Sequence, residues 1–402
     1  MRDVLRGVKV VEVAQWWLAP IGATLLGEWG ADVVKVEHPL HGDPLRGLTT
    51  AGTLPGEFGL NFMFEQANHG KRSLGLDLSR PAGREILDRL IREADVFVTS
   101  FLPSVRARLR LDVDDVRAVN PRIIYARSHG AGDRGPERDR GGYDSALFWA
   151  RGGVAHHLTP PGAAAPVAPR PSFGDGISGL SLAGAIAAAL FGRERHGEPS
   201  VVDVSLLGTA TWVMGPDVCA AALIPGGLPA VRRETQANPL TSCFRTADDR
   251  WIWLALLQAD RHWPELCARL DRPGLVTDPR FAAAADRAAN LTACLAELDA
   301  LFAARPLAEW RRRLDGMSGV WAVVQAAEEL LNDPQVLANG YAPEVGYGDR
   351  AHRLVAGPAQ FDGGPADLSP APAAGEHTDE ILQELGDEYD KIISLKIDGV
   401  VN

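Results

Sequence analysis

An aspartate between two glycines is the residue of this sequence with the clearest potential for catalysis. Asp175 stands in the segment Phe173–Gly179, flanked by Gly174 and Gly176 and directly ahead of a long stretch rich in glycine and alanine. Its carboxylate could act as a nucleophile that is already ionised near neutral pH and needs no general base. A helix N-terminus would favour ionisation and offer amides to an oxyanion. The alternative is a structural N-cap, a position that aspartate also favours.

Other familiar catalytic and nucleotide-binding motifs are incomplete. Gly130–Gly135 matches G-x-G-x-x-G, but Pro136 follows where a dinucleotide-binding fingerprint needs the start of a helix. Gly70–Ser73 lacks the first glycine of a phosphate-binding P-loop. His156 and His157 are adjacent, so their rings cannot face one ligand from the same side of a helix or strand. We therefore expect neither NAD nor a metal.

Charge and cysteine usage restrict the partners and the compartment. The 402 residues include 41 Lys and Arg against 52 Asp and Glu, a net charge of −11. This balance argues against nucleic-acid binding, which needs a basic surface. The four cysteines contain no C-x-x-C pair, which suits a reducing compartment. The longest apolar run, Leu180–Gly192, is shorter than the roughly 20 residues of a membrane span, so we expect a cytoplasmic protein without a membrane anchor.

Alternating strand and helix patterns must position these residues. The β-rich runs lie at 8–13, 33–37, 74–78, 96–98, 123–126 and 201–205, with helical patterns between them. Repeated β-α-β units predict an α/β fold, a Rossmann-like doubly wound sheet that binds ligands beyond the carboxyl ends of its strands. The Pro- and Gly-rich stretch 225–241 is typical of a linker. We therefore predict a discontinuous large domain, 1–224 with 326–402, and a small α+β domain at 225–325.

Short segments in the same order along nearly the whole chain resemble the class III CoA-transferases, the carnitine and bile-acid type. They are Gly30–Pro39 with Gly42, Asp43 and Arg46, then Lys71–Leu74 with Asp77 and Leu78, Ala94–Phe101, Asn120–Tyr125, Gly142–Asp144, Asp278–Phe281, Asp333–Gln335 and Gly375–Thr378. The family has a catalytic aspartate in a G-D-x-x-x-G setting, which Asp175 and Gly179 match. The resemblance favours the catalytic role of Asp175 over the N-cap.

The resemblance implies an acyl-CoA:carboxylate CoA-transferase. Coenzyme A would pass from an acyl-CoA donor to a carboxylic acid acceptor through a covalent aspartyl-CoA intermediate at Asp175. It also implies an interlocked homodimer, in which each chain threads the other.

By position, the resemblance further implies residues that contact CoA and the substrate. The adenine and phosphates would meet His38, Lys71, Arg72 and Arg108. The pantetheine path would be lined by Trp16, Trp17, Leu18, Ser100 and Phe101. Tyr143 and Asp144 would flank the substrate, and the amides of Gly174 and Gly176 would bind the oxyanions.

Departures from the family pattern distinguish its branches. The branch similar to α-methylacyl-CoA racemase uses a histidine where Tyr143 stands, and a phenol is a poor base near neutral pH because it ordinarily titrates near pH ~10. Formyl-CoA transferases have an aromatic residue where Leu48 stands and a glycine-rich loop that 225–262 lacks.

An acyl-CoA racemase or isomerase remains the main alternative. A silent CoA-binding protein is disfavoured by Asp175, and an NAD-dependent oxidoreductase by the glycine-free turn 14–18.

Overall fold

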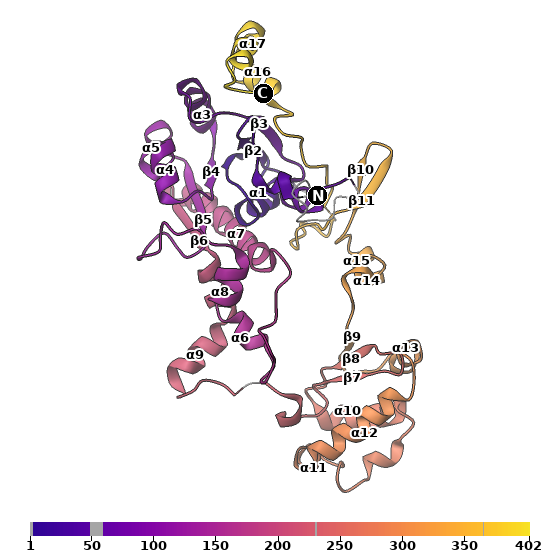
Figure 1. The fold of residues 1–402 in the computed structure, drawn as a ribbon. Coiled ribbons are helices and arrows are strands. Elements are labelled where there is room, and N and C mark those ends of the chain that lie inside the picture. Colours follow the sequence, from indigo (N-terminus) through magenta and orange to yellow (C-terminus); the bar gives the residue numbers. More distant parts are fainter. Residues whose placement is uncertain (1–2, 49–58, 230, 365) are drawn as a thin grey trace. The chain divides into compact units, whose positions relative to one another are not determined.

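The structure, a computed structural model, describes residues 3–48, 59–229, 231–364 and 366–402 (Figure 1). It divides into two compact units. Unit 1 comprises Met1–Gly227 with Pro334–Asn402, and unit 2 comprises Leu228–Asp333. The prediction placed the smaller part at 225–325.

Unit 1 is built on a six-stranded sheet with the order β3-β2-β1-β4-β5-β6. Its strands are β1 (Lys9–Val13), β2 (Asp32–Glu37), β3 (Arg72–Gly75), β4 (Val96–Thr99), β5 (Ile124–His129) and β6 (Val201–Ser205). Every pair of neighbours in this sheet runs parallel. The predicted doubly wound α/β fold is therefore confirmed. The strand order reverses between β1 and β4, the place where such sheets form a ligand-binding crevice.

Helices cover both faces of this sheet. One face packs on α1 (Leu18–Glu28), α7 (Phe173–His196) and α8 (Leu206–Val213), and the other on α3 (Pro81–Glu93), α5 (Val113–Val119), α16 (Thr378–Glu384) and α17 (Tyr389–Ile397). Successive strand residues alternate between the two cores, so that Val10 belongs to the first and Val11 to the second. Because both faces are covered, many strand positions are apolar, although the charged residues Glu12, Lys35 and Glu37 are also buried there.

Small residues let α1 and α7 pack closely together. A Cβ atom added to Gly22 would lie 3.0 Å from the carbonyl oxygen of Gly179, and one added to Gly179 would collide with Ile21. Helix α7 is long and apolar enough by composition to pass as a membrane span, as would α8 and α9 (Gly215–Leu223) together, a pair bent by 69°. The buried side chains of α7, however, form part of the core against the sheet.

Shorter elements complete unit 1. They are η1 (Pro44–Leu48), α2 (Phe62–Asn68), α4 (Pro103–Leu109), the π-helical turn η2 (Ser145–Ala150), α6 (Val154–Leu158), α15 (Pro334–Ala338) and the antiparallel strands β10 (Glu344–Tyr347) and β11 (Arg350–Arg353). The apolar pattern at 328–339 in the sequence predicts one continuous helix, and this prediction is wrong. The segment is broken into α14 (Ala327–Leu330) and α15, which begins at Pro334, a residue without a backbone donor for the preceding turn.

Unit 2 has an antiparallel sheet with the order β7-β8-β9 and its own core. The elements are η3 (Arg233–Thr235), β7 (Cys243–Arg245), β8 (Trp251–Leu254), α10 (Ala259–Arg269), η4 (Pro273–Val276), α11 (Ala284–Ala289), α12 (Leu291–Ala303), α13 (Leu307–Leu314), β9 (Trp321–Val323) and α14. The sequence pattern predicts a hairpin at 245–253, with Asp248 and Asp249 at its turn, and helices near 263–270 and 291–302. The structure confirms all three.

Candidate active site

Asp175 lies in the first turn of α7 and lines a cavity of about 310 Å³ at the carboxyl ends of the parallel strands. We call this cavity the strand-end cavity. Much of its lining comes from residues at or just after the carboxyl ends of β1, β4, β5 and β6, namely Gln15, Trp16, Ser100, Phe101, Ser128, His129 and Leu206. The cavity thus lies at the crevice between β1 and β4 that the topology predicts.

A second cavity of about 310 Å³, here called the Met63 cavity, also reaches Asp175. Three residues, Trp16, Tyr143 and Asp175, line both cavities. Of the predicted site residues, one or both cavities contain Trp16, Trp17, Leu18, Ser100, Phe101, Tyr143, Asp144 and Asp175, whereas neither contains His38, Lys71, Arg72, Arg108, Gly174 or Gly176. The structure therefore brings the aromatic and acidic residues together and separates them from the basic ones.

The first turn of α7 is held by a side chain from far upstream. Asp144 accepts the backbone N–H of Gly174, with its two carboxylate oxygens at 3.0 and 3.1 Å. Ser172, just before the helix, has a left-handed backbone with φ 69°. A Cβ atom at Gly174 would collide with the Phe148 ring and with the Asp144 carboxylate. Position 174 therefore requires glycine for close packing. This packing fixes the backbone next to Asp175.

The two glycine amides do not serve the predicted oxyanion site. The Gly174 N–H is donated to Asp144, and the Gly176 N–H is donated to the carbonyl oxygen of Ser172 at 3.0 Å. Both donors are used inside the turn, so the prediction that they bind an oxyanion is wrong for this structure. Gly176 does leave open space, because a Cβ atom there would meet only Trp17, at 4.0 Å.

Burial changes the protonation of Asp175. Burial, with the negative charge of Asp144 as a second cause, raises the pKa of Asp175 to about 7. Burial also raises the pKa of Asp144, although that carboxylate accepts backbone N–H groups that oppose the rise. The expectation that the helix N-terminus keeps Asp175 fully ionised at neutral pH is therefore corrected. Burial disfavours the charged form of a carboxyl group, which raises its pKa.

The turn after β1 presents two tryptophans to the cavities. Trp16 has φ 69°, a left-handed conformation that is strained for a residue with a side chain. Its backbone N–H donates to Oδ1 of Asp43 at 3.2 Å. Its ring meets Tyr143 edge to face, with centroids 5.4 Å apart and planes at 81°. The indole N–H of Trp17 donates to the carbonyl oxygen of Met63 at 2.9 Å.

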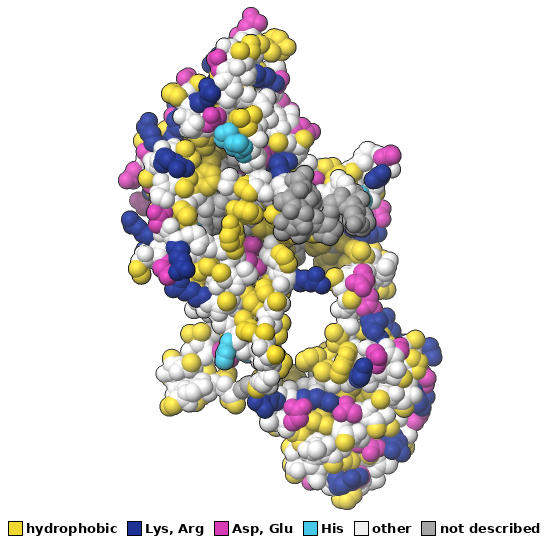
Figure 2. Space-filling model, in the orientation of Figure 1, with side chains coloured by type: hydrophobic (Ala, Val, Ile, Leu, Met, Phe, Trp, Pro, Cys, Tyr) yellow, Lys and Arg dark blue, Asp and Glu magenta, His cyan; other side chains and the backbone are white. Residues whose placement is uncertain are grey.

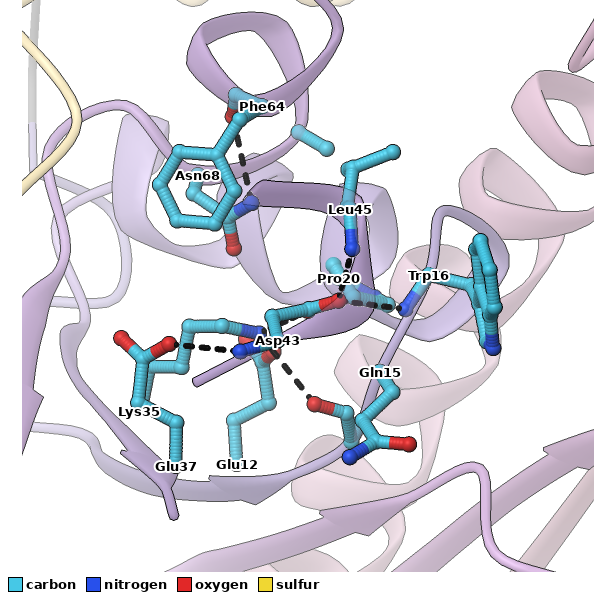
Figure 3. A network of polar contacts seen from close by, with 12 residues as sticks. Glu12, Gln15, Trp16, Pro20, Lys35, Glu37, Asp43, Leu45, Phe64 and Asn68 are labelled. Carbon is cyan, nitrogen blue, oxygen red and sulfur yellow. Dashed lines mark hydrogen bonds and ion pairs between the residues drawn. The ribbon is translucent and has the colours of Figure 1, made fainter. Parts of the chain in front are cut away.

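Asp43 belongs to a buried ion cluster next to this turn, part of which Figure 3 shows. Nζ of Lys35 lies 2.8 Å from Glu12 and 2.9 Å from Asp43. Nζ of Lys71 lies 2.6 Å from Glu12 and donates to the carbonyl oxygen of Pro20 at 2.8 Å. All four charged side chains have 0% exposure. Lys71 therefore stabilises the fold, and the prediction that it faces a CoA phosphate is wrong.

Arg72 is also engaged away from the cavities. It begins β3, at the amino end of the sheet, whereas Asp175 faces the carboxyl ends of the strands. Its guanidinium lies 2.6 Å from Asp32, 3.2 Å from Glu380 and 2.9 Å from Glu384. Three carboxylates already neutralise this cation, so the predicted phosphate contact is corrected.

His38 and Arg108 keep positions that a phosphate could reach. His38 follows β2 at the carboxyl end of the sheet, and its ring stacks on His41 with centroids 4.6 Å apart. Arg108 is exposed on α4, the helix after β4. Their contacts with CoA stay predictions. On the face shown in Figure 2, basic and acidic side chains are interspersed over unit 1.

Sequence reasoning missed three polar residues of the strand-end cavity: Gln15, Ser128 and His129. The Gln15 N–H donates to Oγ of Ser100 at 2.9 Å, which ties the end of β1 to the end of β4. Nδ1 of His129 accepts the N–H of Gly132 at 3.0 Å, so the neutral ring carries its proton on Nε2. Among the described residues, neither this Nε2 nor Oγ of Ser128 has a partner. Their positions at strand ends are the sequence signal that could have selected them.

Comparisons with known proteins cover both units. The family model described as CoA-transferase family III matches residues 5–378. The chain is 32% identical to (R)-2-hydroxy-4-methylpentanoate CoA-transferase of Clostridioides difficile over 99% of both chains. It is 29% identical to cinnamoyl-CoA:phenyllactate CoA-transferase of Clostridium sporogenes, covering 98% of this chain and 97% of that protein.

A solved structure agrees with these matches. The crystal structure of a CaiB/BaiF family protein from Brucella suis is similar with a TM-score of 0.81 at 28% identity, over 96% of this chain and 100% of that one. The expected acyl-CoA:carboxylate chemistry is thereby confirmed at the level of the enzyme class. The chain belongs to CoA-transferase family III.

Proposed function

We propose that Asp175 is the nucleophile that carries CoA from an acyl-CoA donor to a carboxylic acid acceptor. The observation that carries the proposal is the position of its carboxylate, which lines both cavities and so can meet two parts of a bound thioester. Its raised pKa suits this role, because a more basic carboxylate is a better nucleophile once it has lost its proton.

Each step of the transfer breaks one bond for the bond that it forms, and no step oxidises or reduces a group. The Asp175 carboxylate attacks the thioester carbonyl, the C–S bond breaks, and an acyl-aspartyl anhydride and CoA thiolate form. The thiolate attacks the aspartyl carbonyl, which releases the donor acid and leaves aspartyl-CoA. The acceptor carboxylate then attacks aspartyl-CoA and expels the thiolate. The thiolate attacks the acceptor carbonyl of the new anhydride, which gives the product thioester and restores Asp175.

The strand-end cavity is the proposed place for the reactive end of the CoA arm. It lies at the crevice between β1 and β4, and an amide carbonyl of the arm could accept from Nε2–H of His129 while another amide bonds with Oγ of Ser128. Among the described residues that line this cavity, these are the buried polar side-chain atoms without a hydrogen-bond partner. Buried polar groups ordinarily have partners, so these two atoms point to a polar ligand.

Trapping of the intermediate tests the proposed nucleophile. The full chain is incubated with a mixture of acyl-CoA thioesters, treated with hydroxylamine or borohydride, and digested for peptide mass analysis. We expect modification of the peptide that contains Asp175, and its absence in Asp175→Asn. Asp203→Asn, a change on β6 outside both cavities, should leave the modification intact. Labelling of Asp175→Asn equal to that of the parent would rule the proposal out.

We also propose that the chain acts as a homodimer, as the resemblance implies. Helix α9 (Figure 1) has no buried residue. Trp212 on α8 and Leu223 on α9 are 85% and 83% exposed. Apolar surface of this kind marks interaction sites. Sedimentation equilibrium of the full chain should give a dimer, and Trp212→Asp with Leu223→Asp should give a monomer. The control is Leu40→Asp, at another exposed leucine. A monomeric parent chain would contradict the proposal.

A further inference from the structure

The two cavities beside Asp175 are separated by a pair of aromatic rings. Trp16 and Tyr143 line both cavities and meet edge to face at 5.4 Å, a favourable geometry for aromatic contact. Asp175 is the third residue that lines both. A thioester that reacts with Asp175 would thus have its carbonyl at the ring pair and its two ends on opposite sides of it.

The walls of the Met63 cavity are largely apolar. Trp17, Leu45, Leu48 and Met63 line it and belong to, or pack against, one small hydrophobic cluster. The indole N–H of Trp17 is already donated to the backbone at Met63, so this ring presents its apolar surface. The lining contrasts with that of the strand-end cavity, where Nε2 of His129 and Oγ of Ser128 have no hydrogen-bond partner within the part of the chain that the structure describes.

Charged groups of the Met63 cavity lie at its other walls. Asp144 is 6% exposed and already accepts the Gly174 N–H. Arg170 is the one basic side chain among the described residues of the lining, and it is solvent-exposed. A second carboxylate on the acyl group would have to meet Arg170 here, or else lose hydration against the apolar wall.

The backbone of the turn at Trp16 is held in place by contacts inside the protein. Trp16 keeps its strained left-handed backbone because Asp43 accepts its N–H, and Asp43 is itself fixed by Lys35 at 2.9 Å (Figure 3). Strain of this kind persists only where the surroundings impose it, and it concentrates at ligand sites. Trp16 is therefore a rigid wall, positioned by a buried ion cluster.

We propose that the Met63 cavity selects donors with an uncharged, apolar acyl group, a branched aliphatic or an aromatic one. The ring pair of Trp16 and Tyr143 divides this group from the CoA arm in the strand-end cavity. Each methylene buried against Leu48 and Met63 contributes to binding, whereas a terminal carboxylate is penalised by desolvation. The inference rests on the proposed role of Asp175 and adds the class of acyl group to it.

Isotope exchange tests the selectivity without knowledge of the natural acceptor. Each labelled free acid is mixed with its own CoA ester and the full chain, and the label that enters the thioester is measured. We compare 4-methylpentanoyl-CoA and 3-phenylpropanoyl-CoA with succinyl-CoA. We expect kcat/KM for the two apolar esters to exceed that for succinyl-CoA by about a hundredfold, since discrimination of about tenfold or more is ordinary for a single methylene.

Variants of the cavity wall sharpen the test. Leu48→Arg should lower exchange of the apolar esters about tenfold or more and raise that of succinyl-CoA. Leu40→Arg, at a position 83% exposed and outside both cavities, should change neither. Leu48→Ala, a milder change, should keep the fold and shift the preference toward the bulkier aromatic ester. Arg170→Gln should lower exchange of succinyl-CoA more than exchange of the apolar esters.

The outcomes separate the inference from the function it rests on. If succinyl-CoA is the best ester and Arg170→Gln abolishes its exchange, the inference is overturned while trapping at Asp175 still succeeds. If no thioester of either class modifies Asp175, the proposed nucleophile itself fails. Equal exchange of all three esters, unaffected by Leu48→Arg, would also overturn the inference.

Discussion

The Asp144 carboxylate accepts the backbone N–H of Gly174 at 3.0 Å, one residue before the proposed nucleophile. The contact fixes the first turn of α7, and the charge of Asp144 at the same time opposes the ionisation of Asp175. One side chain thus sets both the position and the acidity of its neighbour.

The rate of transfer should depend on pH through Asp175. Since the carboxylate is the proposed nucleophile and its pKa is raised to about 7, kcat/KM should rise with pH and level off above that value. Asp144→Asn keeps an oxygen that can accept the Gly174 N–H but removes the charge, so the midpoint should move to lower pH. Initial rates from pH 5 to 9 measure both profiles. A midpoint that stays in place or rises would contradict this account.

The same raised pKa predicts how Asp175 affects stability. Between the ordinary value of 3.8 and about 7, the folded state binds a proton that the unfolded state has lost. Unfolding free energy should therefore fall as pH rises through this window, by at most about 1.4 kcal/mol for each pH unit. Asp175→Asn does not ionise, so it should be more stable than the parent at pH 8 and similar at pH 4. Urea unfolding at both pH values checks the sign, and a variant less stable at pH 8 would refute it.

The parallel sheet could be predicted because each of its strands has a recognisable pattern within a few consecutive residues. Strands such as β2 and β5 are largely buried, and each contains a short run of β-branched or aromatic residues, Val33–Val34 and Ile124–Tyr125, that stands out between helical patterns. Strand β9 was not predicted, because its three residues, Trp321–Val323, are partly exposed and too short for a periodic pattern. Pro334 is itself a signal for a helix break, but the apolar spacing on both sides of it matches one continuous helix, and so the break was not predicted.

The site was predictable only in part, because charge partners come from distant positions. Asp175 follows from its place at a helix start, whereas Trp16 follows from the resemblance to the family. Whether a lysine faces solvent or a buried carboxylate is set by the fold, and Lys71 meets Glu12 of another strand. The amides at Gly174 and Gly176 appear free in a helix-start pattern, but the fold supplies acceptors for both.

The spacing between Asp175 and Gly179 predicts a stability effect that reaches the site. Residues four apart lie on one helix face, and Gly179 is where α7 meets α1. Gly179→Ala should therefore cost about 1–3 kcal/mol through overpacking, and it should reduce trapping at Asp175. Gly184→Ala in the same helix meets open space and should gain up to about 1 kcal/mol. Urea unfolding compares the two, and equal effects would contradict the packing argument.

The two arginines predicted to bind phosphate should now behave differently. Arg72→Gln should leave the KM for acyl-CoA unchanged, because its guanidinium is held by three carboxylates at the amino end of the sheet. Arg108→Gln should raise that KM about tenfold, the loss expected for one hydrogen bond to a charged group. The KM for the acceptor acid should not change in either variant. A raised acyl-CoA KM in folded Arg72→Gln would restore its predicted role.

The buried cluster of Glu12, Lys35, Asp43 and Lys71 should be intolerant of a single lost charge. Glu12→Gln removes the carboxylate that lies 2.8 Å from Nζ of Lys35 and 2.6 Å from Nζ of Lys71. All three side chains are closed to solvent. Breaking such a buried pair costs about 3–5 kcal/mol. Glu93→Gln breaks the exposed pair with Lys9 and should cost well under about 1 kcal/mol. Thermal and urea unfolding measure both losses.

Because the cluster also holds Asp43 against Trp16, any folded Glu12→Gln should label Asp175 more slowly than Glu93→Gln, and equal labelling would show that the cluster does not position the ring.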